Sequence, residues 1–135
     1  MREIKFRGFS KYLCKWLYGD LEHVEQDHVR IWPIHAPEDN RADDVSPESV
    51  GQYTGLKDSK GQEIYEGDIL AFEILRGKNS RGCVEYSDEK AQYVVRFQRG
   101  KYERSLCHVC SLGKPVVIGN VYENLELLEQ EQPNA

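Results

Sequence analysis

The 135-residue sequence lacks any long apolar run. No segment approaches the roughly 20 apolar residues that a transmembrane helix needs. The first residues, MREIKFRGFSKYL, carry charges, but no continuous apolar segment follows them, so a secretory signal is not expected. We therefore expect a cytoplasmic protein that has no membrane partner.

Cysteine is scarce, with four residues at Cys14, Cys83, Cys107 and Cys110. Without a secretory signal, reduced thiols are expected and disulfides are not. Cys107 and Cys110 form a CxxC pair, which can supply two ligands to zinc, but a structural site needs four and no second CxxC follows. A redox CxxC normally begins a helix in a βαβ pattern, which is missing here. We predict no metal and no cofactor, interpret the pair as lying at a strand end, and keep zinc as an alternative.

A catalytic constellation is also missing. The segment Asp58–Gly61 lacks the alternating acids and the distant glutamate of a calcium loop. Glu63, Glu66 and Asp68 are close in sequence, but carboxylates on a hairpin are usually solvated charges that discourage edge pairing. Nothing in the pattern indicates a cleft or a perturbed pKa. We therefore predict that the chain is not an enzyme and name no catalytic residue.

The composition is that of a globular chain, and the length favours one domain. The net charge of −5 is unevenly distributed. Residues 76–114 contain 9 Lys and Arg against 4 Asp and Glu, whereas residues 115–135 contain four Glu and no basic residue. Such a basic middle segment could meet a phosphate backbone or the acidic ends of the chain itself.

Alternating apolar residues predict strands in the first third of the chain. Residues 2–9 and 12–18 predict a hairpin with its turn near residues 9–11. A third strand, residues 29–34, should lie at an edge or end at Pro33, because proline cannot donate to a ladder. The polar residues 36–49 then predict a mobile connection.

The segment GQYTGLKDSKGQEIYEGDIL, residues 51–70, combines turn chemistry with strand-forming flanks. Asp58 can accept an Asx-type hydrogen bond and Gly61 can adopt a positive φ, which predicts a hairpin loop. Gly67 permits a second turn before Ile69–Leu75, the most apolar strand of the chain.

From Ile69 to Val121 the pattern predicts short strands and no helix. The further strands expected are residues 83–86, 91–97, 102–107 and 115–121, with turns at 77–82, 87–90 and 99–101. Short strands at close spacing favour a barrel or sandwich. Residues 123–130 predict a short helix capped by Asn124.

Basic and aromatic residues alternate around the predicted hairpins. The candidate nucleic-acid contacts are Arg76, Lys78, Arg81, Arg96, Arg99, Lys101 and Arg104. Tyr93, Phe97 and Tyr102 lie between them, and aromatic faces stack on unpaired bases while cations contact phosphates. The alternation also fits a core position for Tyr93 and Phe97, and the chain is acidic, with a pI of about 5.4. Nucleic-acid binding is therefore the alternative function.

Three segments together resemble the YopX family of small phage and prophage proteins. They are REIKFRGF at residues 2–9, QYTGLKDSKGQEIYEGDIL at 52–70 and VIGNVYENLELLE at 117–129. Leu125 departs from the pattern, since the family commonly has proline there. The resemblance implies a mainly β fold with an SH3-like small barrel in its C-terminal part. The family has no assigned activity, so no functional residue is carried over.

The resemblance also implies that the matched glycines are backbone hinges of the barrel: Gly51, Gly55, Gly61, Gly67 and Gly119. We expect one domain, 1–135, in three parts. These are an N-terminal β-rich extension with its loop at 1–49, the SH3-like barrel at 50–122, and a short helix and frayed tail at 123–135.

Aromatic residues of the N-terminal part, Trp16, Tyr18 and Trp32, exceed what a small core can bury, and such residues are favoured in interfaces. We therefore expect a homo-oligomer. The leading interpretation is a non-enzymatic protein-interaction or assembly module whose further partner is an unidentified host or phage protein.

Overall fold

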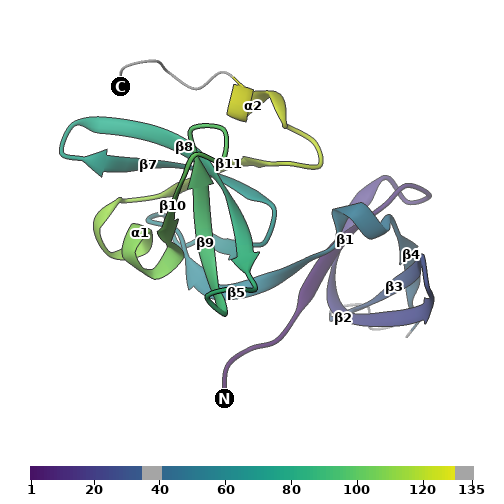
Figure 1. Cartoon of the computed structure of the whole chain (residues 1–135). Coiled ribbons are helices and arrows are strands. Elements are labelled where there is room, and N and C mark those ends of the chain that lie inside the picture. The colour runs from purple at the N-terminus through teal and green to yellow at the C-terminus, as the bar shows by residue number, and fades with distance from the viewer. Residues whose placement is uncertain (35–40, 130–135) are drawn as a thin grey trace. The chain divides into compact units, whose positions relative to one another are not determined.

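The structure of the chain, a computed structural model, describes residues 1–34 and 41–129 (Figure 1). Two antiparallel sheets dominate it, so the mainly β prediction is confirmed. The chain divides into two compact units, Met1–Tyr53 and Thr54–Ala135. The subdivision at residues 49 and 122 expected from the sequence stays a prediction. Part of the expected mobile connection, residues 36–40, and the expected frayed tail lie outside the described residues.

The Met1–Tyr53 unit is built on an antiparallel sheet with strand order β4-β3-β2-β1-β5-β6, of which β5 and β6 lead into the second unit. Its elements are β1 (Phe6–Ser10), β2 (Lys15–Glu25), β3 (His28–Pro33), β4 (Asp43–Val45) and the 3-10 turn η1 (Pro47–Ser49). The predicted β1–β2 hairpin is confirmed, although its turn lies at residues 11–14. Strand β3 ends at Pro33, as the missing proline N–H predicts.

One face of this sheet carries the unit's small core. Leu17, Val29, Ile31 and Val45 are buried there, with Phe6, Leu21 and Val50 packed against them. Because successive strand residues point to opposite faces, the residues between them point away from the core. The unit therefore presents a second sheet face that its own core does not cover.

The Thr54–Ala135 unit contains a second antiparallel sheet with strand order β10-β9-β8-β7-β11. The strands of this sheet are β7 (Asp68–Leu75), β8 (Lys78–Ser87), β9 (Gln92–Phe97), β10 (Tyr102–Ser105) and β11 (Val116–Asn120). The unit also contains β6 (Glu63–Tyr65) and most of β5 (Gly51–Lys57), which begins in the first unit. Its helices are α1 (Leu106–Leu112) and α2 (Glu126–Glu129).

The five-stranded sheet is open. Among the described strands, β10 pairs with β9 alone and β11 pairs with β7 alone. The prediction of a closed small barrel is therefore wrong, because the two outer strands of this sheet do not meet. The SH3-like resemblance stays a prediction.

The core of this unit lies on one face of the five-stranded sheet. Its buried side chains are Ile64, Leu70, Phe72, Val84, Val95, Phe97, Leu106 and Val109. Phe72 and Phe97 meet edge to face, with ring centroids 5.4 Å apart. The predicted alternation along β9 is confirmed, because Val95 and Phe97 lie in this core while Arg96 lies outside it.

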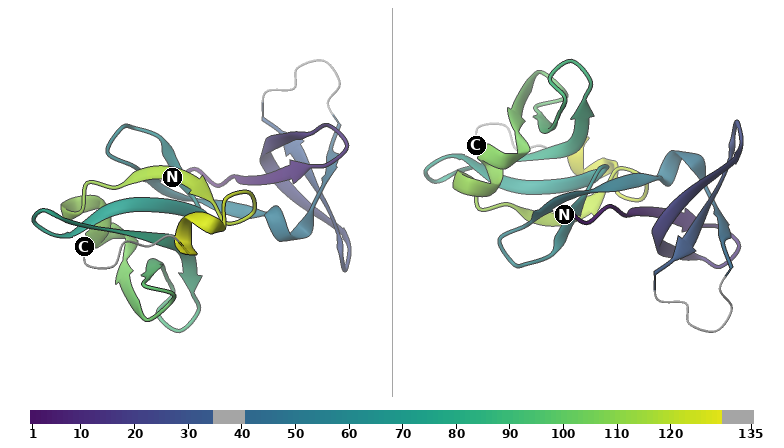
Figure 2. Two further views of the ribbon diagram at one scale, coloured as in Figure 1. Left: turned by 90° about the horizontal axis from the view of Figure 1, so that it is seen from above. Right: turned by 90° about the horizontal axis from the view of Figure 1, so that it is seen from below.

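Helix α1 replaces the strand predicted at residues 102–107, of which only Tyr102–Ser105 is extended. Leu106 and Val109 are spaced by three residues and are buried against the sheet. The helix packs on β9, β10 and β7, away from α2, which packs on β8 (Figures 1 and 2). With two turns only, its apolar period is too short to stand out from the flanking strand pattern.

The turn predicted at residues 77–82 is also wrong, since β8 begins at Lys78 and only Gly77, with φ of +80°, has turn geometry. Gly82 is a strand residue. A Cβ atom placed on it would lie 2.7 Å from the backbone oxygen of Arg96 and 2.7 Å from Cγ1 of Val95. Glycine is present there because β9 approaches closely, not because the chain turns.

The C-terminal helix is confirmed, but it is shorter than predicted. The side-chain oxygen of Asn124 accepts a hydrogen bond from the backbone N–H of Asn120 at 3.2 Å, so it closes the preceding turn instead of capping α2.

Asp58 organises the loop between β5 and β6. Its Oδ1 accepts the backbone N–H groups of Lys60 and Gln62, each at 2.9 Å, as the Asx-turn prediction requires. Its Oδ2 accepts the N–H of Val117 on β11 at 3.0 Å. Burial would raise the pKa of Asp58, but these donors outweigh it and hold the pKa below its ordinary value.

We expect Asp58→Asn to lower the free energy of unfolding at neutral pH by about 2 kcal/mol, because an amide N–H then faces the N–H of Val117. A carboxylate with a lowered native pKa stabilises the fold above its unfolded pKa of roughly 4 and loses that contribution as the pH falls through the native value. Urea unfolding at several pH values should therefore show that the difference in free energy of unfolding between variant and parent becomes smaller in acid. The exposed Asp88→Asn is the control, and a difference that persists unchanged in acid would contradict this account.

Gly82→Ala should destabilise the chain by about 1–3 kcal/mol, because the new methyl group must displace the backbone of β9. Thermal or urea unfolding measures the loss. The exposed Asn79→Ala on the same strand is the matched control, with an expected change within about 0.5 kcal/mol. Equal stabilities of the two variants would show that β8 and β9 are not packed as described.

Candidate interaction surfaces

The outer face of the N-terminal sheet carries a continuous group of aromatic residues. The β1–β2 register places Arg7 opposite Tyr18 and Phe9 opposite Trp16. Phe9 and Trp16 meet edge to face at 5.5 Å between centroids, and the Arg7 guanidinium lies 4.8 Å from the Trp16 ring centroid. Trp32 on β3 pairs with Asp20 and so points to the same face as Tyr18. We name Arg7, Phe9, Trp16, Tyr18 and Trp32 the aromatic face.

Two of these aromatic side chains remain accessible: Tyr18 is 44% exposed and Trp32 40% exposed. The Trp32 indole N–H donates to Oε1 of Glu22 at 3.3 Å, which fixes its ring against the sheet. The aromatic face is therefore an ordered surface, in which the ring of Trp32 is held in place by Glu22.

Charged residues of both signs border the aromatic face. Asp44 Oδ1 lies 2.8 Å from Nε2 of His28 and 3.1 Å from Nε of Arg30. The hydrogen bond with His28, aided by Arg30, lowers the pKa of Asp44. The border thus carries fixed positive and negative groups side by side.

The seven basic residues predicted to contact nucleic acid fall into different settings. Arg96 is occupied by two carboxylates, with Nε 3.4 Å from Oε1 of Glu85 and Nη1 2.9 Å from Oε1 of Glu103. Lys90 also contacts Glu103, at 2.6 Å, and this hydrogen bond is the main cause of the lowered pKa of Glu103. The charge of Arg96 is therefore largely compensated within the sheet.

Arg81 and Arg104 donate to backbone carbonyls of their own unit. Arg81 Nη1 lies 3.3 Å from the oxygen of Leu127, and Arg104 Nη1 lies 3.1 Å from the oxygen of Ile74. The Arg104 guanidinium is also 5.9 Å from the Phe97 ring centroid. Both side chains thus hold neighbouring elements together.

The other four predicted residues lie at turns. Arg76 and Lys78 flank Gly77 at the β7–β8 turn, while Arg99 and Lys101 flank Gly100 at the β9–β10 turn. Of the interleaved aromatics, Phe97 is core and Tyr102 is 47% exposed, beneath the Lys101 ammonium. Nucleic-acid contact by these residues stays a prediction.

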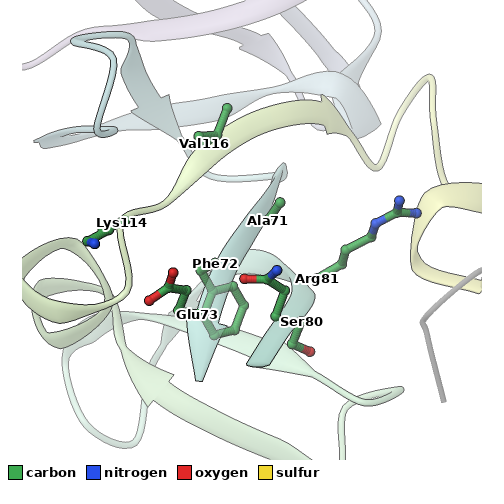
Figure 3. A pocket seen from close by; sticks show the side chains of 8 residues that line it. Ala71, Phe72, Glu73, Ser80, Arg81, Lys114 and Val116 are labelled. Carbon is green, nitrogen blue, oxygen red and sulfur yellow. The ribbon is translucent and has the colours of Figure 1, made fainter. Parts of the chain in front are cut away.

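A hollow of about 350 Å³ lies on the β7–β8–β11 part of the sheet (Figure 3). It is lined by Ala71, Phe72, Glu73, Asn79, Ser80, Arg81, Lys114 and Val116. Arg81 extends from this hollow toward α2, in keeping with its hydrogen bond to Leu127. The hollow is small, and the Arg81 guanidinium in its lining already donates a hydrogen bond to Leu127.

A larger cavity of about 490 Å³ lies between the end of the β7–β8 hairpin and α1. We name it the α1 cavity. Its lining residues are Glu73, Ile74, Leu75, Arg76, Arg104, His108, Val109, Leu112, Gly113 and Lys114. It brings together two predicted basic residues, Arg76 and Arg104, with two that sequence reasoning missed, His108 and Lys114. Recognising α1 would have revealed them, because that helix carries His108 and ends just before Lys114.

Cys107 and Cys110 lie on α1, so their predicted place at a strand end is wrong. Cys107 is exposed, and Cys110 is half-buried. Burial, with smaller effects of Cys107 and Asp58, raises the pKa of Cys110 to about 11, so this thiol is protonated at neutral pH. Among the described residues, no group of three or more His, Cys, Asp and Glu side chains could hold a metal ion. The zinc alternative itself stays untested.

Of the carboxylates Glu63, Glu66 and Asp68, two contact the same residue, Tyr65. Asp68 is buried and its Oδ2 accepts the backbone N–H of Tyr65 at 2.7 Å. Glu63 Oε1 accepts the hydroxyl of Tyr65 at 3.3 Å. These interactions fix the turn around Gly67.

A crystal structure of protein EF1440 from Enterococcus faecalis has a similar fold, with a TM-score of 0.57. The sequence identity is 22%, and the match covers 95% of this chain and 99% of that chain. A search of curated proteins gave no match. No described helix has the length and apolarity needed to cross a bilayer.

The family model described as YopX protein matches residues 5–129, which is nearly the whole chain. This agrees with the three sequence segments that resemble the family. The chain belongs to the YopX family.

Proposed function

We propose that this YopX-family chain is a non-enzymatic interaction module of a phage or prophage, and that it self-associates through its aromatic face. The observation that carries the proposal is the exposure of Tyr18 and Trp32 on the sheet face opposite the unit's core. A second copy of the chain is the occupant that this surface fits best.

The residue types of the aromatic face support a protein interface. Tryptophan, tyrosine and arginine are the side chains that contribute most to binding energy at interface centres. Here all three occur within one face of β1, β2 and β3. Because Trp32 is anchored by Glu22, little side-chain entropy is lost when a partner covers it.

The charges around the aromatic face favour a second copy as the partner. In a two-fold contact, each patch meets itself, so a surface of one sign would repel its copy. Asp20, Glu22 and Asp44 lie here beside Arg30, and Asp44 already pairs with Arg30. A mixed border of this kind can meet itself with opposite charges in register.

The titratable groups of the second unit support a non-enzymatic role. Asp58 and Asp68 accept backbone N–H groups, and Glu103 is shared by Lys90 and Arg96. Cys110 keeps its proton at neutral pH. The three carboxylates are thus committed to holding the fold, and the Cys110 thiol is not ionised, whereas a catalytic acid, base or nucleophile must face a substrate.

Nucleic-acid binding has weaker support. Arg96, Arg81 and Arg104 are engaged by carboxylates or carbonyls, and Phe97 is buried in the core. Part of the donor capacity of three of the seven cations is therefore already used, and one stacking face is missing from the surface that the sequence suggested.

Replacing Tyr18 and Trp32 together by serine should abolish self-association at micromolar concentrations, because each central aromatic typically contributes about 2 kcal/mol or more. Loss of either contribution alone raises the dissociation constant about 30-fold, and the two together raise it about 1000-fold if they add. Light scattering across a concentration series measures this. The matched control is Tyr86→Ser with Tyr102→Ser, two exposed aromatics of the other unit, which should associate like the parent.

A parent chain that stays monomeric throughout the series would overturn the proposal. So would a Tyr18→Ser, Trp32→Ser variant that folds, as judged by circular dichroism, and still associates with parental affinity.

A further inference from the structure

The α1 cavity has a chemistry that the proposed self-association does not use. It lies wholly within the Thr54–Ala135 unit, whereas the aromatic face belongs to Met1–Tyr53. Its walls are the end of β7, the β7–β8 turn, the residue Arg104 of β10, helix α1 and the residues just after α1. The hydrogen bond from the N–H of Glu73 to the oxygen of Gly113, at 2.8 Å, fixes two of these walls together.

Positive charge exceeds negative charge in this cavity. Arg76, Arg104 and Lys114 are permanent cations, whereas Glu73 is the one carboxylate among the lining residues. Within residues 1–34 and 41–129, the side chains of Arg76 and Lys114 make no hydrogen bond or ion pair. Arg104 donates one N–H to the oxygen of Ile74. This hydrogen bond orients the guanidinium and leaves its other N–H groups able to donate. An anionic group is therefore the complementary ligand.

The remaining walls of the α1 cavity are aliphatic. Leu75 and Leu112 are 60% and 67% exposed at its rim, Val109 belongs to the core, and Ile74 packs against that core. Exposed leucines of this kind gain free energy when an apolar group covers them. The ligand should therefore join an anion to an aliphatic group.

This lining discriminates between two kinds of anionic macromolecule. Single-stranded nucleic acid is normally held by aromatic side chains on which its bases stack, and the lining residues of the α1 cavity include no Phe, Tyr or Trp. A peptide with acidic and aliphatic side chains matches both the cations and the leucines. The volume of about 490 Å³ is in the range of sites that hold a few side chains.

We propose that the α1 cavity binds an acidic, leucine-containing peptide segment of a partner protein, with carboxylates on Arg76 and Lys114 and an aliphatic side chain against Leu75 and Leu112. The site gives the chain a second interaction, which does not require self-association. Its partner is recognised by charge and by aliphatic contact together, so neither feature alone is sufficient.

Fluorescence anisotropy with a short fluorescein-labelled synthetic peptide of glutamate and leucine, spaced by serine, tests the proposal on the full chain. The parent should bind it at low salt, and added salt should weaken binding. Arg76→Glu with Lys114→Glu should reduce affinity at least tenfold. The matched control, Arg99→Glu with Lys101→Glu, makes the same change in net charge outside the cavity. Its affinity for the peptide should stay within about twofold of that of the parent, because net charge alone acts weakly at long range.

Two altered peptides and a second protein variant separate the contribution of charge to binding from that of apolar contact. A peptide with glutamine in place of glutamate should bind at least tenfold more weakly, and so should a peptide with serine in place of leucine. Leu112→Ser, at an exposed position, provides a second protein variant if the charge reversal fails to fold. It should weaken binding of the leucine peptide and leave binding of the serine peptide unchanged.

Several outcomes would overturn the proposal. One is equal weakening by the control pair, which would mean that binding depends on net charge alone. Another is binding of single-stranded oligothymidine, lost in the Arg76→Glu, Lys114→Glu variant, without binding of the peptide. A third is loss of self-association in that variant, which would make a second copy the occupant. Tyr18→Ser with Trp32→Ser should leave peptide affinity unchanged, so failure of the self-association proposal is distinguishable from failure of this one.

Discussion

The carboxylate of Asp58 is the interaction on which the rest of the Thr54–Ala135 unit depends. It closes the turn after β5 through Lys60 and Gln62 and reaches β11 through Val117. Ser59 adds two hydrogen bonds to the oxygen of Pro115, each at 2.8 Å. Because β11 is an outer strand held on one side by β7, these hydrogen bonds give its first residues a second attachment and fix where the strand begins after α1. The walls of the α1 cavity are set by the same constraint.

Turn chemistry and strand alternation could be predicted from the sequence because both depend on local interactions. Asp58 and Gly61 form the expected turn, and Val95 and Phe97 occupy the expected face of β9. Sheet closure could not be predicted, because it depends on which distant strands pair. Gly82 illustrates the limit: glycine permits a turn, but here it permits close contact with β9, and only the partner strand distinguishes the two.

The candidate sites were harder to predict than the fold. Clustering in sequence suggested seven basic residues, but pairing across the sheet commits Arg96 to Glu85 and Glu103. The basic residues that line the α1 cavity are Arg76, Arg104, His108 and Lys114, and helix α1 brings them together. That helix is short enough that its stability comes from burying Leu106 and Val109, a tertiary effect with little local signal.

The two proposed surfaces can serve different partners because each is built on the side of its elements that its core does not need. Tyr18 and Trp32 lie opposite Leu17 and Ile31, so changing them leaves the buried face of the sheet filled. Arg76, Leu112 and Lys114 likewise surround the core residue Val109 without forming part of that core. Substitutions on either surface therefore cost little stability, since no cavity opens beneath them. A small protein with this arrangement can change the partner of one surface while the fold and the other surface are retained.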